Sequence, residues 1–229
     1  MEVITAKNVK VPMPSAEYMR QLRRSLLAFA GPHDPLTIAL STSDWPGRQT
    51  THSIYSVGLT TIIDPKGLDR VDKPFCRRFL AGGHKNMTTA AGCWATHEAY
   101  RSPARVMTTF RGPEAADVLT SAEELNNLSE LTAHPETQYE PRVLRIPGLY
   151  LEAFWLKSAA AGDLIVPYGL FMDSNDAVHA GREQPLKKGK AYPAADFQQI
   201  VGKAAEQQLA ADLALRGQPV KTRATGQFA

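Results

Sequence analysis

Cys93 and His97 are the two residues whose types and spacing are best suited to chemistry. They lie in segment 92–98, which reads GCWATHE. A helix predicted over 86–100 places the thiol and the imidazole four residues apart, on one helical face. A nucleophilic thiol needs a base within hydrogen-bonding reach. The pattern therefore offers Cys93 as a nucleophile with His97 as its base.

His179 is the alternative base for the same thiol. Its flanking residues are polar and typical of a loop. The string GCWA at 92–95 resembles the tetrapeptide around the nucleophile of papain-like cysteine proteases. The chain has neither the upstream cysteine of that motif nor an Asn-Ser-Trp-Gly string, so no family membership follows. A cysteine-dependent hydrolase or transferase is one hypothesis, and Cys93 as a small core residue is the competing one.

A structural zinc site is a further possibility, because four residues have suitable ligand types: Cys76, His84, Cys93 and His97. Their spacing does not match a compact Cys-x-x-Cys knuckle. Two cysteines are also too few for a disulfide framework, and we expect reduced thiols. The sequence predicts neither a bound metal nor a cofactor.

Glu152 is the carboxylate that stands out, because it lies on a strand that is otherwise apolar on both faces. A buried carboxylate needs a partner or a raised pKa. We expect exposure at a strand edge or an arginine partner such as Arg105. The basic pair Arg77-Arg78 is interpreted, like the other short basic clusters, as solvated surface.

Composition limits the classes of protein. The chain has 229 residues, 43% of them hydrophobic, and a net charge of +3 from 26 basic and 23 acidic side chains. This near balance argues against nucleic-acid binding. The apolar runs are too short to span a membrane, and the N-terminus lacks the features of a signal peptide. We expect a cytoplasmic protein with no membrane partner.

The first half of the chain shows mixed patterns. We expect an extended arm at 1–14, a helix from its Ser15 N-cap to Ala30, and a helix over 86–100. Segments 36–42 and 52–64 are predicted to form a hairpin of two strands. The polar stretch that follows, up to Gly83, is predicted to be rich in loops.

The second half is more regular. The expected strands cover 105–110, 142–146, 149–157 and 163–168. Ser121 to Glu124 matches a capping box, which predicts a short helix through Leu131. A long amphipathic helix begins at 193 or 194 and ends near Leu215. Its apolar residues recur every four positions: Phe197, Val201, Ala205, Leu209 and Leu213.

These patterns predict an α+β fold, in which a mixed or antiparallel sheet carries packed helices and the chain closes with the long helix. One globular domain is expected over 15–217, followed by a flexible basic tail at 218–229. Because no coherent catalytic set is visible, we expect a non-catalytic protein-interaction or assembly subunit. Its expected partners are other protein chains, in a homo-oligomer or a larger complex.

Overall fold

The computed structural model describes residues 2–3, 8–41, 48–82, 90–170 and 186–216. Its strands are β1 Glu2–Val3, β2 Arg48–Ser56, β3 Cys76–Gly82, β4 Ala91–Ala95, β5 Val106–Arg111, β6 Glu140–Ile146, β7 Leu151–Lys157, β8 Leu164–Leu170 and β9 Tyr192–Pro193. Its α-helices are α1 Ala16–Ala30, α2 Pro35–Ser41, α3 Leu59–Ile63, α4 Pro113–Glu124, α5 Ser129–Ala133 and α6 Ala194–Arg216. Short 3₁₀ turns are η1 Leu68–Arg70, η3 Glu98–Tyr100, η4 Leu125–Asn127 and η5 Pro147–Leu149.

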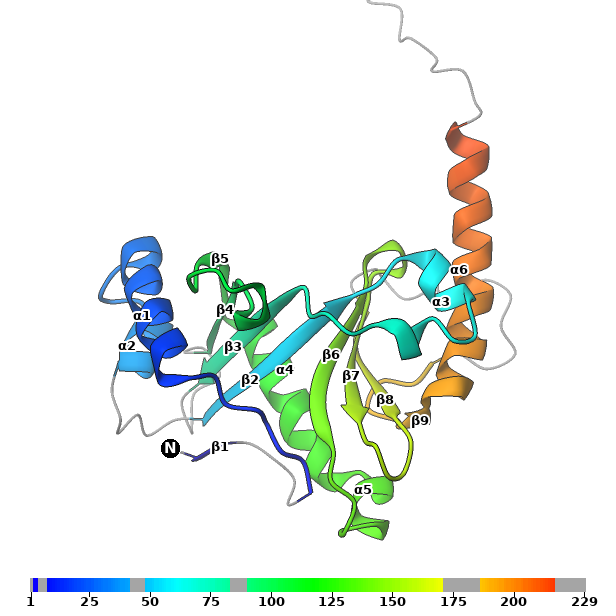
Figure 1. The fold of residues 1–229 in the computed structure, drawn as a ribbon, viewed down its shortest axis with the longest axis horizontal. Coiled ribbons are helices and arrows are strands. Elements are labelled where there is room, and N and C mark those ends of the chain that lie inside the picture. Colours follow the sequence, from blue (N-terminus) through cyan, green and yellow to red (C-terminus); the bar gives the residue numbers. More distant parts are fainter. Residues whose placement is uncertain (1, 4–7, 42–47, 83–89, 171–185, 217–229) are drawn as a thin grey trace, which may run out of the picture.

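All nine strands belong to one mixed sheet with the order β5-β4-β3-β2-β6-β7-β8-β9, and β1 pairs with one end of β2 (Figure 1). Strand β2 is antiparallel to β3 and parallel to both β6 and β1, while the other neighbouring strands are antiparallel. The predicted α+β fold with a mixed sheet, packed helices and a long last helix is therefore confirmed.

The helices cover both faces of the sheet (Figure 1). Helix α4 packs on one side, called the α4 face below, over a core that includes Leu80, Phe154 and Val166. On the opposite face, α1 and α2 cover β3 and β4 around Phe79. Helices α3 and α6 cover β6, β7 and β8 on that face around Trp155. The central strands are thus buried on both sides.

Several local predictions are confirmed. The Ser15 side chain accepts a hydrogen bond from the backbone N–H of Tyr18 and caps α1, which ends at Gly31 with φ of 86°. Glycine suits this position because a positive φ strains other residues. Strands β5, β6, β7 and β8 and helix α6 also lie where the patterns placed them. On α1, however, Phe29 is 55% exposed, although it follows the buried Leu22 and Leu26 at helical spacing.

The predicted helix over 86–100 is wrong. Among its described residues, the chain forms β4 and the short turn η3. Strand β4 lies between β3 and β5 and is buried on both faces, so its small residues do not alternate in polarity. Gly92 permits this packing, because a Cβ there would lie 2.3 Å from the ring of Phe110.

The predicted hairpin of 36–42 with 52–64 is also wrong. Segment 36–42 lies largely in helix α2, whose start is capped by Asp34 through bonds of 2.9 Å and 3.2 Å from the backbone N–H groups of Leu36 and Thr37. Strand β2 ends at Ser56 and pairs with β3 and β6 instead. The sequence Asp-Pro before an apolar run was the overlooked signal of a helix start.

Two further expectations need correction. The stretch before Gly83, expected to be rich in loops, contains β3, and all seven residues of this strand are buried. The arginine pair Arg77-Arg78 lies in β3 and is 2% and 1% exposed, so it is not solvated surface. Ser121 does not begin a helix, because it lies within the continuous helix α4.

Candidate functional site

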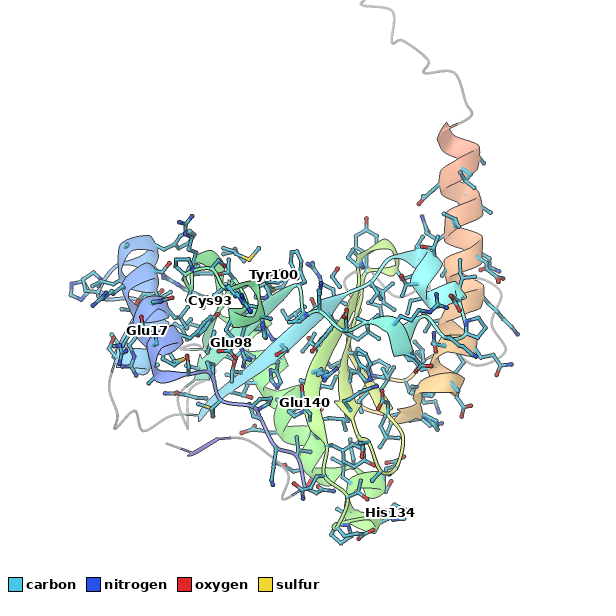
Figure 2. The ribbon with its side chains drawn as sticks, in the orientation of Figure 1. Glu17, Cys93, Glu98, Tyr100, His134 and Glu140 are labelled. Carbon is cyan, nitrogen blue, oxygen red and sulfur yellow. The ribbon has the colours of Figure 1, made fainter. Side chains whose placement is uncertain are left out.

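Cys93 lies on β4 and faces the core under α1 and α2 (Figure 2). Its exposed fraction is 0%. Burial, followed by the negative charge of Asp34 and the neighbouring Cys76, raises the pKa of the Cys93 thiol to about 12. The thiol is therefore protonated at neutral pH, which is the state of a core cysteine and not of an activated nucleophile.

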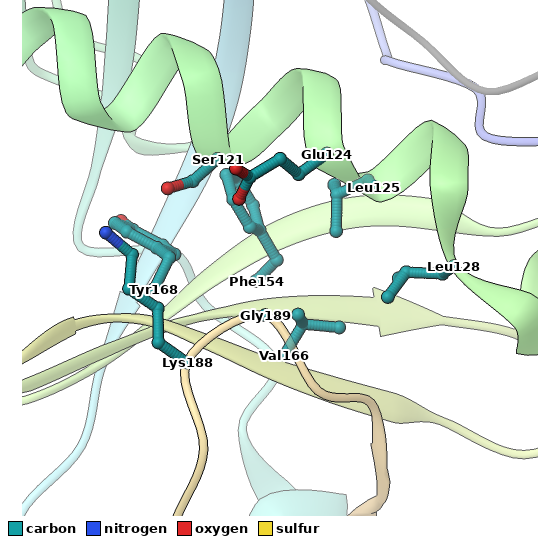
Figure 3. Close-up of a pocket in the computed structure, with 9 residues that line it drawn as sticks. All are labelled: Ser121, Glu124, Leu125, Leu128, Phe154, Val166, Tyr168, Lys188 and Gly189. Carbon is teal, nitrogen blue, oxygen red and sulfur yellow. The ribbon is translucent and has the colours of Figure 1, made fainter.

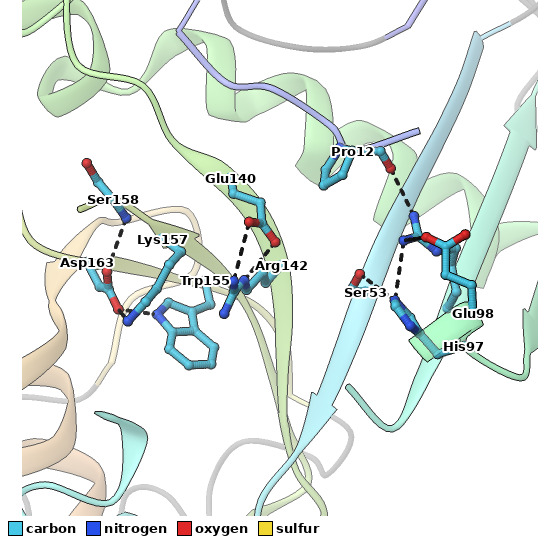
Figure 4. Close-up of polar contacts among 11 residues, drawn as sticks. Pro12, Ser53, His97, Glu98, Glu140, Arg142, Trp155, Lys157, Ser158 and Asp163 are labelled. Atoms are coloured by element: carbon cyan, nitrogen blue, oxygen red, sulfur yellow. Dashed lines mark hydrogen bonds and ion pairs between the residues drawn. The ribbon is translucent and has the colours of Figure 1, made fainter. Parts of the chain in front are cut away.

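His97 follows β4 and occupies the N-cap of η3. Its Nδ1 accepts a hydrogen bond of 3.1 Å from the backbone N–H of Ala99, and its Nε2 lies 3.0 Å from the hydroxyl oxygen of Ser53 (Figure 4). Burial, with the adjacent Arg77 guanidinium, lowers the pKa of His97 to about 4. The same Nε2 atom lies 3.3 Å from Nη2 of Arg77, so both ring nitrogens of His97 are engaged in contacts with neighbouring groups.

The predicted Cys–His pairing finds no supporting contact in the described part of the chain. No hydrogen bond joins Cys93 to a histidine among these residues, and His97 is engaged with Ser53, Arg77 and Ala99. His179 lies outside the described residues. The use of Cys93 as a nucleophile stays a prediction.

The structure does not bring the possible zinc ligands Cys76 and Cys93 together either. Cys76 belongs to the core on the α4 face, whereas Cys93 belongs to a core on the opposite face. Both cysteines are free thiols. His84 lies outside the described residues, and the described part of the chain contains no group of three potential metal-ligating side chains.

A connected group of buried polar side chains lies on the α4 face, around Arg78 of β3. Its Nη1 donates a hydrogen bond of 2.6 Å to the Tyr168 hydroxyl and one of 3.5 Å to the Glu152 carboxylate. The Tyr168 hydroxyl donates in turn to Glu152 at 2.7 Å. Arg145 of β6 pairs with the other oxygen of Glu152 at 3.2 Å. Glu152 thus has two arginine partners, neither of which is the expected Arg105.

Two ring residues complete this group. In the sheet, Arg78 lies directly opposite His52 of β2 and Trp94 of β4. The Arg145 guanidinium lies over the Trp94 ring, 4.5 Å from its centroid. Together, six residues form what is called the Arg78 cluster below: His52, Arg78, Trp94, Arg145, Glu152 and Tyr168.

The Arg78 cluster carries a net positive charge. Burial, followed by the charges of Arg78 and Arg77, lowers the pKa of His52 well below its usual value, so its ring is neutral. Burial raises the pKa of Tyr168 above its usual value, so its hydroxyl is protonated. Two guanidinium groups then face one carboxylate, Glu152.

Several buried donor atoms of the Arg78 cluster have no hydrogen-bonding partner among the described residues. They are Arg78 Nε and Nη2 and Trp94 Nε1, together with the His52 Nδ1 atom, whose role depends on the tautomer. Buried polar groups without partners are rare and costly. Sequence patterns pointed to one member of the cluster, Glu152, because the arginines were assigned to the surface.

Two hollows lie away from the predicted thiol site. A small recess between α4 and the sheet is lined by Ser121, Glu124 and Lys188 around a floor that includes Phe154 and Tyr168 (Figure 3). Because Tyr168 belongs to both, the recess borders the Arg78 cluster. A second hollow, of about 470 Å³, lies beside α5 next to His134 and Tyr139.

The C-terminal half of α6 is the most prominent surface feature. Figure 1 shows it extending past the sheet and the other helices. Along the predicted apolar face, Phe197, Val201 and Ala205 are fully buried. Leu209 is only partly buried and Leu213 is 61% exposed. The apolar face therefore continues beyond the domain that covers its first half.

Comparisons with known proteins identify no relative. No family model matches the chain, and no curated protein and no solved structure is significantly similar to it. Among the described helices, none is both long enough and apolar enough to cross a membrane.

Proposed function

We propose that this protein is a non-catalytic assembly subunit that associates with a second copy of itself through the C-terminal half of α6. The observation that carries the proposal is the continuation of one apolar face from the core into solvent. Leu209 and Leu213 extend the spacing of the buried Phe197, Val201 and Ala205. These two leucines are called the distal stripe below.

The distal stripe has the form of a helix-packing surface. Apolar side chains four residues apart lie above one another on a helix and pack into the grooves of a neighbour. The exposed Ala210 and Ala214 beside them are small enough to let another backbone approach closely. Helix α6 has 23 residues, so it is about 35 Å long, and only its first half is held by the domain.

A second copy is the occupant that best fits so short a stripe. In a twofold contact the same patch is used twice, so an antiparallel pair of helices doubles the apolar surface that each chain contributes. The contact spans only about three turns, which places it at the small end of stable interfaces. We therefore expect association that depends on protein concentration.

Sedimentation velocity across a concentration series tests the proposal. The wild-type chain is expected to shift from the mass of one 25.1 kDa chain towards twice that mass as its concentration rises. The double variant Leu209→Ser/Leu213→Ser is expected to stay at the mass of one chain. It should keep most of its unfolding free energy, because Leu213 is 61% exposed and Leu209 is only partly buried.

A matched control uses exposed apolar side chains of another helix. Leu27 and Phe29 of α1 are 50% and 55% exposed. The double variant Leu27→Ser/Phe29→Ser should associate like the wild type. Equal loss of association in both double variants would argue for general hydrophobic contact and against α6. A wild-type chain that stays monomeric at every concentration would overturn the proposal.

A further inference from the structure

The unpartnered edge of Arg78 has the geometry of an anion-binding fork. The Nε and Nη2 atoms of an arginine lie on the same edge of the guanidinium plane and form two parallel hydrogen bonds to a carboxylate. In Arg78 these are the two atoms without a partner, while Nη1 holds Tyr168 and Glu152. The Nη1 atom therefore holds the Arg78 side chain in place, while its Nε and Nη2 atoms have no partner among the described residues.

Arg142 provides an internal comparison on the opposite face of the same sheet. Its Nε donates to one oxygen of Glu140 at 2.8 Å, and its Nη2 donates to the other oxygen at 3.3 Å (Figure 4). The chain therefore satisfies this fork with its own carboxylate where the arginine is structural. Arg78 is more deeply buried than Arg142, with side chains 2% and 17% exposed, yet its fork lacks such a carboxylate.

Charge and neighbouring donors point to the same kind of ligand. The Arg78 cluster holds two guanidinium groups and one carboxylate, so one added negative charge would make it neutral. The unpartnered indole N–H of Trp94 lies on the adjacent strand, directly opposite Arg78. Arg145, whose side chain is 31% exposed, lies over the Trp94 ring and connects the buried cluster to the surface.

We propose that the Arg78 cluster binds a small monocarboxylate, with the ligand oxygens on the Nε and Nη2 atoms of Arg78 and the Trp94 indole as an additional donor. A single negative charge matches the net charge of the cluster, whereas a phosphate dianion would leave one excess buried charge. Burying an uncompensated charge is costly. The ring of Phe154, whose centroid lies 4.4 Å from that of Tyr168, borders the cluster on its apolar side.

Two-dimensional ¹H–¹⁵N NMR of the full chain tests the site directly. The chain has three tryptophans, and Trp94→Phe identifies the indole N–H signal of Trp94. Titration of the wild type with acetate, and separately with benzoate, is expected to move this signal in a saturable way. Sodium chloride at matched ionic strength serves as the reference, and it should not move the signal.

Variants of the two arginines separate the fork from charge alone. Arg78→Lys keeps the charge but removes the fork, and it is expected to weaken binding about tenfold or more through the lost charged hydrogen bond. Arg142→Lys, the matched control, should leave binding unchanged. Because the wild-type titration does not depend on Arg78→Lys, the test holds even if that variant folds poorly.

Three results would overturn the proposal. The first is a Trp94 indole signal that neither acetate nor benzoate moves. The second is movement with inorganic phosphate alone, which would contradict the assignment of a monocarboxylate. The third is equal weakening by Arg78→Lys and Arg142→Lys, which would mean that the fork of Arg78 does not hold the ligand.

Discussion

Replacing Glu152 with Gln tests the electrostatic account of the Arg78 cluster. The side chains of Arg78 and Glu152 are both 2% exposed, and Arg145 pairs with the same carboxylate. Removing one partner of a buried ion pair typically costs about 3–5 kcal/mol, because the remaining charge is left uncompensated. Glutamine can still accept the Tyr168 hydrogen bond, so we expect the lower end, about 3 kcal/mol.

Urea unfolding followed by tryptophan fluorescence measures this loss. In a domain of this size, a loss of about 1 kcal/mol in unfolding free energy lowers the melting temperature by about 2–4 °C. A thermal melt of Glu152→Gln should therefore give a melting temperature roughly 6–12 °C lower than that of the wild type. The slope of the unfolding free energy against urea should not change, because the surface exposed on unfolding stays the same. A changed slope would indicate altered compactness and would invalidate the comparison.

Glu140→Gln is the matched control for this experiment. Glu140 also pairs with an arginine, Arg142, but its side chain is 38% exposed. Solvent screens such a pair, and its loss should cost about 1 kcal/mol or less. A loss below about 1 kcal/mol for Glu152→Gln, or equal losses for the two variants, would refute the buried pairing described for Glu152.

Three other predictions follow from the described contacts. The folded-state pKa of His97 is lowered to about 4 from its ordinary value of 6.5, so the unfolded chain binds more protons than the folded chain between these two pH values. The unfolding free energy should therefore fall as the pH drops from 6.5 to 4, and it should fall less steeply in His97→Asn. An unchanged slope in that variant would contradict the burial of a neutral ring. Burial raises the pKa of both Cys76 and Cys93 to about 12, so iodoacetamide should label both thiols slowly in the native chain and rapidly in urea. Fast labelling of Cys93 alone in the native chain would favour the hypothesis of a cysteine-dependent hydrolase or transferase. Gly67→Ala should lower the unfolding free energy by about 1–3 kcal/mol, since its Cβ would lie 1.7 Å from a backbone oxygen of α3. Gly202→Ala in α6 should raise the unfolding free energy by roughly 0.5–1 kcal/mol, because alanine favours the helix. Chemical denaturation measures both variants, and equal effects would contradict this packing.

The elements predicted correctly from the sequence have strong local patterns. Helix α1 begins at a capping serine and ends at a glycine with positive φ, and both signals are readable from residue type. Helix α6 repeats apolar residues every four positions. Strands β6, β7 and β8 form consecutive antiparallel neighbours separated by turn residues, so their limits are visible along the chain.

The errors arise where tertiary contacts override local pattern. Strand β4 is rich in small residues and has helical character by composition, yet it lies between two strands and is buried on both faces. Strand β3 carries Arg77 and Arg78, which resemble surface residues in sequence. Their burial depends on partners far along the chain, Glu98 for the first and Glu152 with Tyr168 for the second. No local spacing predicts such pairs.

The candidate site shows the same division. Glu152 was recognised because it is the one charge on a strand with two apolar faces. The sheet order that brings Arg78 to it was not predictable, because helices separate β3 from β7 in sequence and β2 and β6 lie between them in the sheet. Cys93 and His97 were paired on the assumption of a helix, and β4 removes that relation.

The solution mass of the native chain tests the central claim, self-association through α6, most directly. Sedimentation velocity is run over a concentration series for the wild type and for Leu209→Ser/Leu213→Ser. The account predicts that the wild type moves from one chain mass towards two while the variant stays at one. A wild type that stays at one chain mass throughout, or a variant that associates as strongly as the wild type, would contradict it.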